Sequence, residues 1–286
     1  ERGLGGAVIG GDVDVIHATS LTTPPRRGRP LTVMVHDLAW RAFPQAYPRR
    51  GRRWHEAALA RALREARTFV VPAVTVADDL VAAGADGRRV EVVEEGCDHL
   101  PLADLDAANG VLERCGVRDG YLLGVSTLEP RKNLPRLVEA YVRARPALPE
   151  PWPLVLVGPR GWGDALPEVP HGVALAGAVS DAALAGLYRQ ARCFAYVPVA
   201  EGFGLPPLEA MRECVPVVAS RAVPSAAGAA LCVDAGDVEG IARALVVAAS
   251  DDRVRAELVT AGLLRSRDLT WEAAARRHAE IWEAAR

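Results

Sequence analysis

The sequence contains almost no lysine. Its 34 basic residues are all arginines except Lys132. Arginine is therefore the default cation of this chain, and the single exception asks for a reason. A lysine ammonium is compact, so it fits against a phosphate oxygen in a crowded site where the planar fork of arginine would not. Lys132 is thus a candidate phosphate-binding residue, with chance drift as the alternative.

Other scarcities exclude whole classes of protein. No apolar run approaches the ~20 residues of a membrane-spanning helix. A net charge of −2 and a pI near 6.4 argue against a nucleic-acid-binding protein. The five cysteines are odd in number and lack the close pairing of zinc ligands, so we expect reduced thiols in the core of a cytoplasmic protein. They are Cys97, Cys115, Cys193, Cys214 and Cys232.

Short apolar segments alternate with helical patterns along most of the chain. Strands are expected at 14–18, 31–38, 69–73, 90–93, 121–126, 153–158, 172–177, 192–199, 215–220 and 230–234. Helices are expected at 52–66, 76–84, 133–144 and 181–191, the last with Ser180 as its N-cap. Such alternation with continuous apolar strands is typical of parallel sheets covered by helices on both faces.

A polar stretch near 101–120 interrupts the alternation and predicts two α/β domains. We place a Rossmann-like N-terminal domain at 1–104 and a second Rossmann-like domain at 105–270. The segment 271–286 carries apolar residues at helical spacing, and we expect it to pack back toward the first domain. Ligands of this architecture bind outside the carboxyl ends of the strands, which predicts a site in a cleft between the two domains.

The first chemically informative stretch is "AEGFGLPPLEAM" at 200–211, which places Glu201 and Glu209 on either side of a tight turn. A buried apolar strand leads into it. Gly202 and Gly204 permit backbone conformations closed to other residues. The two prolines suit the first turn of a helix. A strand, a glycine turn and a helix N-terminus present free N–H groups, which attract anions.

The second stretch, "GVSTLEPRKNLPRLVEAY" at 124–141, has the same strand-turn-helix order. Arg131 and Lys132 are expected at the start of its helix. Basic residues there oppose the helix dipole and cost a few tenths of a kcal/mol. An anion bound at that end would reverse the balance. A solvated surface pair is the alternative, but we expect the glycine turn on the same strand edge, which favours an anion site.

These motifs together carry a family resemblance. "STLEPRKNL", followed by "EGFGLPPLEAM", resembles the retaining glycosyltransferases of family 4, which have the GT-B fold. The similarity continues through "VPVVAS", "VDAGDVEGIARAL" and "LTWEAAARRHAEIW" and reaches back to "VHDL" and "VVEEGCDHLP", so it covers nearly the whole chain. Within the family, the chain most resembles bacterial enzymes of the mannosyltransferase type.

The resemblance implies catalytic and donor-binding roles for residues of the two turns. Arg131 and Lys132 would hold the diphosphate of a nucleotide-sugar. Glu201 would lie beside the transferred sugar, and Glu209 would accept hydrogen bonds from the ribose hydroxyls. His36, at the end of a strand in the first domain, would face the sugar from across the cleft.

The resemblance also implies a set of backbone contacts with the donor. Gly202 and the amides of Phe203, Gly204 and Leu205 would lie near the sugar hydroxyls and the phosphates. The backbone around Gly124, Ser126 and Val179 would line the nucleotide pocket.

Glycosyl transfer suits these residue types. Breaking the anomeric C–O bond builds positive charge on the sugar and negative charge on the departing diphosphate. Two cations and a helix N-terminus stabilise that leaving group without a metal. We find no Asp-x-Asp motif that offers a metal site, and we attribute the Asp78–Asp79 pair to the start of its helix, so we expect no metal and no other cofactor. A glycosidase would need an acid and a nucleophile flanking one bond, which two residues of one turn and helix do not supply.

The chain also departs from the family pattern. Members usually begin with a strand and a glycine-rich loop well before the segment equivalent to 14–18, which only thirteen residues precede here. The resemblance therefore implies an incomplete N-terminal domain. The region 221–230 is short and lacks the usual acidic residue, and Cys214 replaces a common glycine.

Two other functions stay open at this point. One is a non-catalytic nucleotide-sugar-binding or scaffold protein, and the other is a GT-B sugar-nucleotide epimerase. For a transferase, GDP-mannose is the favoured donor, and the acceptor is a carbohydrate, a lipid-linked sugar or a small molecule. No nucleic-acid partner is expected. Contact with the inner face of the membrane and the oligomeric state stay open.

Overall fold

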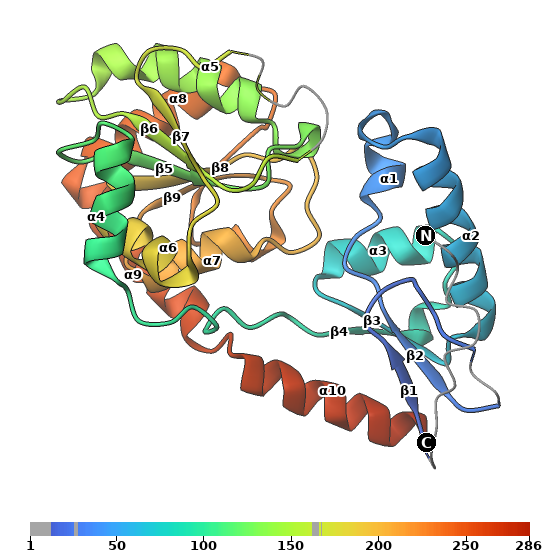
Figure 1. Ribbon diagram of the computed structural model, residues 1–286. Coiled ribbons are helices and arrows are strands. Elements are labelled where there is room, and N and C mark those ends of the chain that lie inside the picture. Colours follow the sequence, from blue (N-terminus) through green and yellow to red (C-terminus); the bar gives the residue numbers. More distant parts are fainter. Residues whose placement is uncertain (1–12, 26–27, 162–165, 167) are drawn as a thin grey trace. The chain divides into compact units, whose positions relative to one another are not determined.

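The computed structural model describes residues 13–25, 28–161, 166 and 168–286. They form two compact units, which we call the N unit and the C unit. The N unit combines the described residues up to Glu95 with Glu272–Arg286, and the C unit is Gly96–Trp271 (Figure 1).

The C unit begins at Gly96, before the predicted boundary at 105, because the segment after Gly96 bonds to that unit. The Cys97 amide donates to the Leu269 carbonyl at 3.0 Å. The Asp104 amide donates to the Ala182 carbonyl at 2.9 Å.

The N unit contains a four-stranded parallel sheet in the order β1-β2-β3-β4. Its strands are β1 (Ile16–Ala18), β2 (Leu31–Met34), β3 (Thr68–Val71) and β4 (Val90–Val92). Its helices are α1 (Ala39–Ala42), α2 (Arg49–Glu65), α3 (Val74–Ala82) and α10 (Trp271–Ala285), which starts at the last residue of the C unit.

Helix α10 covers one face of the N-unit sheet. Met34 and Val70 share a buried apolar cluster with Ala274 and Ile281 of α10. Side chains alternate between the two faces of a strand, so the neighbouring residues face the other way. Figure 1 shows α2 on that opposite side.

Several strands are shorter than predicted, and the N unit gives one example. The segment predicted at 31–38 ends as a strand at Met34. An Asp37 carboxylate oxygen accepts from the Ala39 amide at 3.0 Å, which begins helix α1 and ends the extended chain.

The C unit contains a six-stranded parallel sheet in the order β10-β9-β8-β5-β6-β7. Its strands are β5 (Leu122–Val125), β6 (Leu154–Val157), β7 (Val173–Gly177), β8 (Cys193–Tyr196), β9 (Val217–Ser220) and β10 (Leu231–Val233). The first strand of the unit, β5, lies between β6 and β8, so the winding direction reverses there. This is the Rossmann strand order, in which ligands bind at the reversal point.

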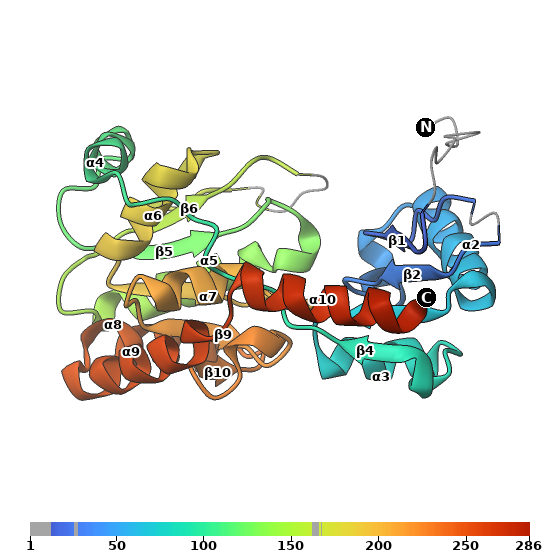
Figure 2. The same cartoon turned by 90° about the horizontal axis from the view of Figure 1, so that it is seen from below.

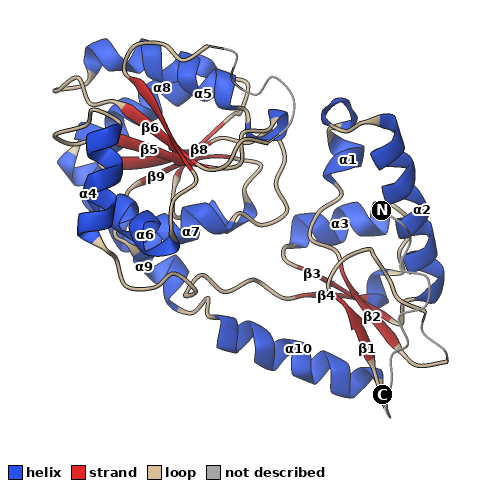
Figure 3. Cartoon of the chain, viewed as in Figure 1, coloured by secondary structure: helices blue, strands red, loops and turns tan. Residues whose placement is uncertain are grey.

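Helices cover both faces of the C-unit sheet. They are α4 (Leu105–Arg114), α5 (Leu134–Ala144), α6 (Asp181–Gln190), α7 (Leu205–Arg212), α8 (Val238–Ser250) and α9 (Asp252–Arg267). Helices α5 and α8 pack together on one face, and α4 and α6 pack together on the other (Figures 1, 2 and 3). Ser180 caps α6 as predicted, because its hydroxyl accepts from the Ala183 amide.

Helix α4 lies in the stretch that the sequence indicated as a polar interruption. An Asp104 carboxylate oxygen accepts from the Ala107 amide at 2.9 Å and caps the helix. Ala108, Val111 and Leu112 are its buried residues. These three form a narrow apolar stripe among polar residues and Gly110, which explains why the sequence did not indicate a helix here. Within the described residues, no helix is both long and apolar enough to cross a membrane.

Candidate functional site

The two turns singled out by the sequence follow neighbouring strands of the C-unit sheet. Strands β5 and β8 are paired in parallel, so their carboxyl ends lie at the same edge. The turn with Arg131 follows β5, and the turn with Glu201 follows β8. Backbone contacts join them, since the Val199 amide donates to the Arg131 carbonyl at 3.0 Å. The side-chain amide of Asn133 donates to the Val197 carbonyl at 2.9 Å.

Glu201 forms ion pairs with both basic residues. The Lys132 ammonium lies 2.6 Å from Glu201 Oε2, and the Arg131 guanidinium lies 3.0 Å from Glu201 Oε1. Arg131 also pairs with Glu129 at 3.0 Å. None of these four side chains is more than 14% exposed. The structure therefore brings the predicted cations and the predicted glutamate together in a nearly buried cluster.

Burial acts to raise the pKa of the Glu201 carboxyl, but the charges of Lys132 and Arg131 outweigh it and hold the pKa at about 2. Glu201 is therefore ionised at neutral pH. A carboxylate with two cations has a fixed orientation and cannot serve as a proton donor. It can stabilise positive charge that develops next to it.

The basic pair lies before its helix rather than in the first turn of it. Pro130–Lys132 form one turn of 3-10 helix, Asn133 is left-handed with φ 60°, and α5 begins at Leu134. The sequence predicted that an anion would relieve the unfavourable position of the two cations. In the structure, the Glu201 carboxylate is that anion.

The glycine turn is held in one conformation by Ser225. Gly204 has φ 99°, and a Cβ there would lie 2.6 Å from a Val223 side-chain atom. The Ser225 amide donates to the Phe203 carbonyl at 3.1 Å, and the Ser225 hydroxyl donates to the Gly204 carbonyl at 2.6 Å. In a trans peptide plane the N–H points away from the C=O. Ser225 thus turns the amides of Gly204 and Leu205 away from itself.

Glu209 lies on α7 and is bonded at both carboxylate oxygens. The Tyr188 hydroxyl donates to Oε2 at 2.8 Å, and His99 Nε2 lies 3.3 Å from Oε1. The hydrogen bond with Glu209 raises the pKa of His99. The Tyr188 side of the carboxylate is fully buried, whereas the His99 side chain is 36% exposed. Oxygen Oε1 therefore lies on the less buried side of the carboxylate, next to His99.

The predicted backbone contacts lie at the same edge of the sheet. Gly124 is in β5, and a Cβ there would lie 2.8 Å from the Leu156 side chain, so close packing explains the glycine. The Ser126 amide donates to the Val157 carbonyl at 2.9 Å. Val179 lies between the end of β7 and the cap of α6. Their contact with a nucleotide stays a prediction.

His36 belongs to the N unit and follows β2. Its Nδ1 lies 3.1 Å from Glu95 Oε1, and its Nε2 lies 3.1 Å from the Thr19 carbonyl oxygen. The hydrogen bond with Glu95 raises the pKa of His36. Thr19, His36 and Glu95 come after β1, β2 and β4, so they gather at the carboxyl edge of that sheet. The role of His36 toward a sugar stays a prediction.

Acidic residues do not gather into a metal site in the described ranges, where no group of three or more His, Cys, Asp or Glu side chains fits an ion. Two Asp-x-Asp triplets do occur, away from the two turns. In one, Asp14 pairs with Arg286 at 3.0 Å, and Asp12 lies outside the described residues. In the other, Asp104 caps α4.

Sequence reasoning missed several partners of the predicted residues, four of them in the clusters around Glu201 and Glu209. These four are Glu129, Tyr188, Tyr196 and His99. A signal existed for Tyr196, because a tyrosine inside a buried strand must find a hydrogen-bond partner for its hydroxyl. No such signal existed for His99, because nothing in its neighbours indicates Glu209, which is distant in the sequence.

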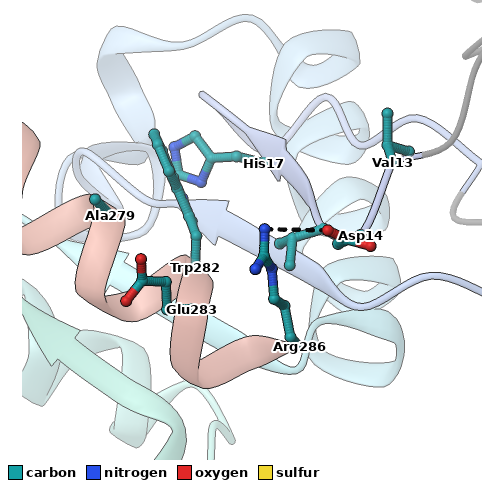
Figure 4. A pocket seen from close by; sticks show the side chains of 8 residues that line it. Val13, Asp14, His17, Ala279, Trp282, Glu283 and Arg286 are labelled. Carbon is teal, nitrogen blue, oxygen red and sulfur yellow. Dashed lines mark ion pairs between the residues drawn. The ribbon is translucent and has the colours of Figure 1, made fainter.

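The N unit also has a pocket of about 470 Å³ near the amino end of β1. His17, Trp282 and the Asp14–Arg286 ion pair line it (Figure 4). Burial and the neighbouring His278 lower the pKa of His17 to about 4, so its ring is neutral. None of the predicted site residues lines this pocket, and we assign it no function.

Comparison with known proteins gives family matches over most of the chain. The family model described as Glycosyltransferase Family 4 matches residues 3–99, and the model described as Glycosyl transferases group 1 matches residues 119–251. O-antigen chain mannosyltransferase B of Escherichia coli is 30% identical over 271 residues, covering 90% of this chain and 71% of that protein. The serotype-specific mannosyltransferase WbdA of Escherichia coli is 27% identical over 201 residues, covering 66% of this chain and 24% of WbdA.

Solved structures confirm the predicted GT-B fold. Anabaena HepE in complex with UDP-glucose superposes with a TM-score of 0.79 at 20% identity, covering 95% of this chain and 79% of that one. Sucrose-phosphate synthase of Thermosynechococcus elongatus gives a TM-score of 0.74 at 20% identity, covering 95% and 73%. At these identities the likeness shows the fold and nothing about the substrate.

Proposed function

We propose that this chain, which belongs to glycosyltransferase family 4, transfers a hexose from a nucleotide-diphosphate sugar to an acceptor with retention of anomeric configuration. The observation that supports it best is the meeting of Lys132, Arg131 and Glu201 at the reversal point of the C-unit sheet. Mannose is the favoured sugar, and GDP-mannose the favoured donor, because the curated relatives are mannosyltransferases.

The two cations stabilise the leaving group. As the anomeric C–O bond breaks, negative charge grows on the diphosphate. Lys132 and Arg131 lie at most 14% exposed, where a fixed charge acts more strongly than in water. The amides that Ser225 orients, those of Gly204 and Leu205, add donors on the same turn.

The two glutamates act on different parts of the donor. Glu201 is ionised and lies beside both cations, so it faces the anomeric carbon when the diphosphate is bound to them, and its charge stabilises the oxocarbenium character of the sugar. Glu209 accepts hydrogen bonds from the ribose through Oε1. His36 of the N unit contacts the transferred sugar.

The reaction needs no metal, because protein cations carry the leaving-group charge that a divalent ion would otherwise neutralise. Full activity should therefore survive a chelator. Loss of activity in EDTA with recovery on adding Mg²⁺ or Mn²⁺ would contradict this part of the proposal.

The experiment that tests the function is turnover of a panel of nucleotide-sugars that includes GDP-mannose and UDP-glucose, with simple mannosides as acceptors. We expect release of the nucleoside diphosphate and a product with the donor's anomeric configuration in the NMR spectrum. Lys132→Ala serves as the impaired variant, and Arg143→Ala, which removes an exposed cation of α5, as the matched control.

The same assay separates the alternatives. A sugar-nucleotide epimerase would convert the donor sugar into its epimer without an acceptor. A binding or scaffold protein would bind a donor and turn over none of them. Either outcome would refute transfer.

A further inference from the structure

Glu201 and Glu209 each accept a hydrogen bond from a different buried tyrosine. The Tyr196 hydroxyl of β8 lies 2.6 Å from Glu201 Oε2, and the Tyr188 hydroxyl of α6 lies 2.8 Å from Glu209 Oε2. Tyr196 is 4% exposed and Tyr188 is fully buried. Neither hydroxyl has ready access to solvent, so the carboxylates are the acceptors for their O–H groups.

The two tyrosines pack against one phenylalanine. The Phe194 ring lies 5.4 Å from the Tyr188 ring, edge to face, and 6.2 Å from the Tyr196 ring, nearly parallel. Phe194 and Tyr196 are two residues apart on β8, so they share one face of the strand. Phe194 therefore packs between the tyrosine that contacts Glu201 and the tyrosine that contacts Glu209.

Both hydroxyls keep their protons. Burial raises the pKa of Tyr188 well above its ordinary value, and the charge of Glu209 raises it further. Burial and Glu201 raise the pKa of Tyr196 in the same way. Each tyrosine is therefore a donor to its carboxylate at neutral pH.

We propose that Tyr196 and Tyr188 are positioning residues of the transfer reaction, one for each glutamate. Tyr196 holds Glu201 against Lys132, because the hydroxyl, the carboxylate and the ammonium lie 2.6 Å from one another. Tyr188 fixes Oε2 of Glu209 and leaves Oε1 for the ribose of the donor. The assignment rests on the proposed function, but the tyrosines are no part of the predicted site.

Removing one hydroxyl while keeping the ring tests each tyrosine. Tyr196→Phe should lower kcat about ten-fold with a smaller change in the donor KM, because Glu201 acts on charge that develops in the transition state. Tyr188→Phe should raise the donor KM about five-fold and leave kcat within about two-fold, because ribose contacts are equal in the ground and transition states.

Tyr141→Phe is the matched control. The fully buried Tyr141 hydroxyl donates to the Trp152 carbonyl at 3.0 Å, on the amino side of β6 and away from both glutamates. The Tyr141→Phe variant also loses a hydrogen bond of a buried tyrosine hydroxyl. Its melting temperature should therefore fall, while kcat and KM stay at wild-type values.

Double variants show whether each tyrosine acts through its glutamate. Adding Tyr196→Phe to Glu201→Gln, or Tyr188→Phe to Glu209→Gln, should change kcat and KM by less than about two-fold, since the group being positioned is gone. The proposal would be overturned if each tyrosine substitution changed kcat or KM as much in the glutamine variant as in the wild-type chain. It would also be overturned if Tyr196→Phe and Tyr188→Phe had wild-type kcat and KM, as expected of Tyr141→Phe.

Calorimetry with GDP gives a readout that needs no turnover. Tyr188→Phe should weaken GDP binding about five-fold in an otherwise wild-type chain and leave the affinity of Glu209→Gln unchanged. If the wild-type chain binds GDP but transfers no sugar, the proposed function fails, and this comparison still decides whether Tyr188 positions Glu209. Unaltered GDP affinity in Tyr188→Phe would refute that role.

Discussion

The Lys132 ammonium lies 2.6 Å from the Glu201 carboxylate, although 69 residues separate them in the chain. Lys132 is the only lysine of the sequence. In the proposed function Lys132 binds the diphosphate, so a donor would have to share Lys132 with Glu201 or displace that carboxylate. This competition sets what each variant should do.

Replacing Glu201 should separate catalysis from affinity. Glu201→Gln removes the charge beside the developing positive sugar, so kcat should fall on the order of 100-fold. It also removes an anion that repels the diphosphate and occupies both cations, so free GDP should bind more tightly. Kinetics and calorimetry measure the two effects. Glu213→Gln, which breaks the ion pair with Arg189 at the opposite end of α7, is the control. An unchanged kcat in Glu201→Gln would refute the catalytic role of Glu201.

Lys132 should not be replaceable by arginine. Its ammonium lies 2.6 Å from both Glu201 and Tyr196 and its side chain is 13% exposed, so the wider guanidinium fork would have to displace one of these partners. We expect Lys132→Arg to lower kcat/KM at least about ten-fold, and Lys132→Ala to raise KM and lower kcat together. Steady-state kinetics check this. Wild-type values for Lys132→Arg would make the single lysine an accident of composition.

The His99–Glu209 contact should give a pH-dependent contribution to stability. The hydrogen bond to Glu209 raises the pKa of His99 above 6.5, with Glu209, Asp181 and Asp98 as the facing acids. Because the folded-state pKa is the higher one, the stabilisation is present below pH 6.5 and is lost as the pH rises through the folded-state pKa. Urea denaturation should show His99→Gln less stable than wild type at pH 6, with a smaller difference at pH 8. A difference independent of pH would contradict the contact, and His171→Gln is the control.

Cys214 should be a site where glycine stabilises the fold. It follows α7 in the left-handed region with φ 61°, and it is an exposed thiol rather than a core one as the sequence predicted. The Cys214 amide donates to Met211 and the Val215 amide to Ala210, the bonds of a Schellman cap, where glycine is the preferred residue. Cys214→Gly should raise the free energy of unfolding by about 0.5–1 kcal/mol. Cys214→Ala keeps the strain and should give no gain; an equal gain would contradict the backbone explanation.

The sheets could be predicted from sequence because their strands are apolar on both faces. Each described strand overlaps a predicted segment, although β3 begins one residue before its segment, at Thr68. Strands β5 and β8 carry the two turns to one edge, as expected from parallel pairing. Helix α4 was not predicted, because its three buried residues lie among polar residues and a glycine.

The candidate site could be predicted only as a set of residue types at strand ends. Spacing along the chain does not reveal that Glu201 would pair with Lys132 and Arg131, because that contact depends on which strands are neighbours. The same reason hides Tyr188 and His99, which reach Glu209 from other elements. The contact of Ser225 with Gly204 depends on a turn conformation that no pattern specifies.

A crystal structure of the chain with GDP tests the central claim most directly. We expect oxygens of the diphosphate within about 3 Å of both the Arg131 guanidinium and the Lys132 ammonium, the distance of a charge-assisted hydrogen bond. The ribose hydroxyls should face Oε1 of Glu209. A bound nucleotide whose diphosphate lies more than about 6 Å from both cations, beyond the range of a direct charge interaction, would contradict the assignment.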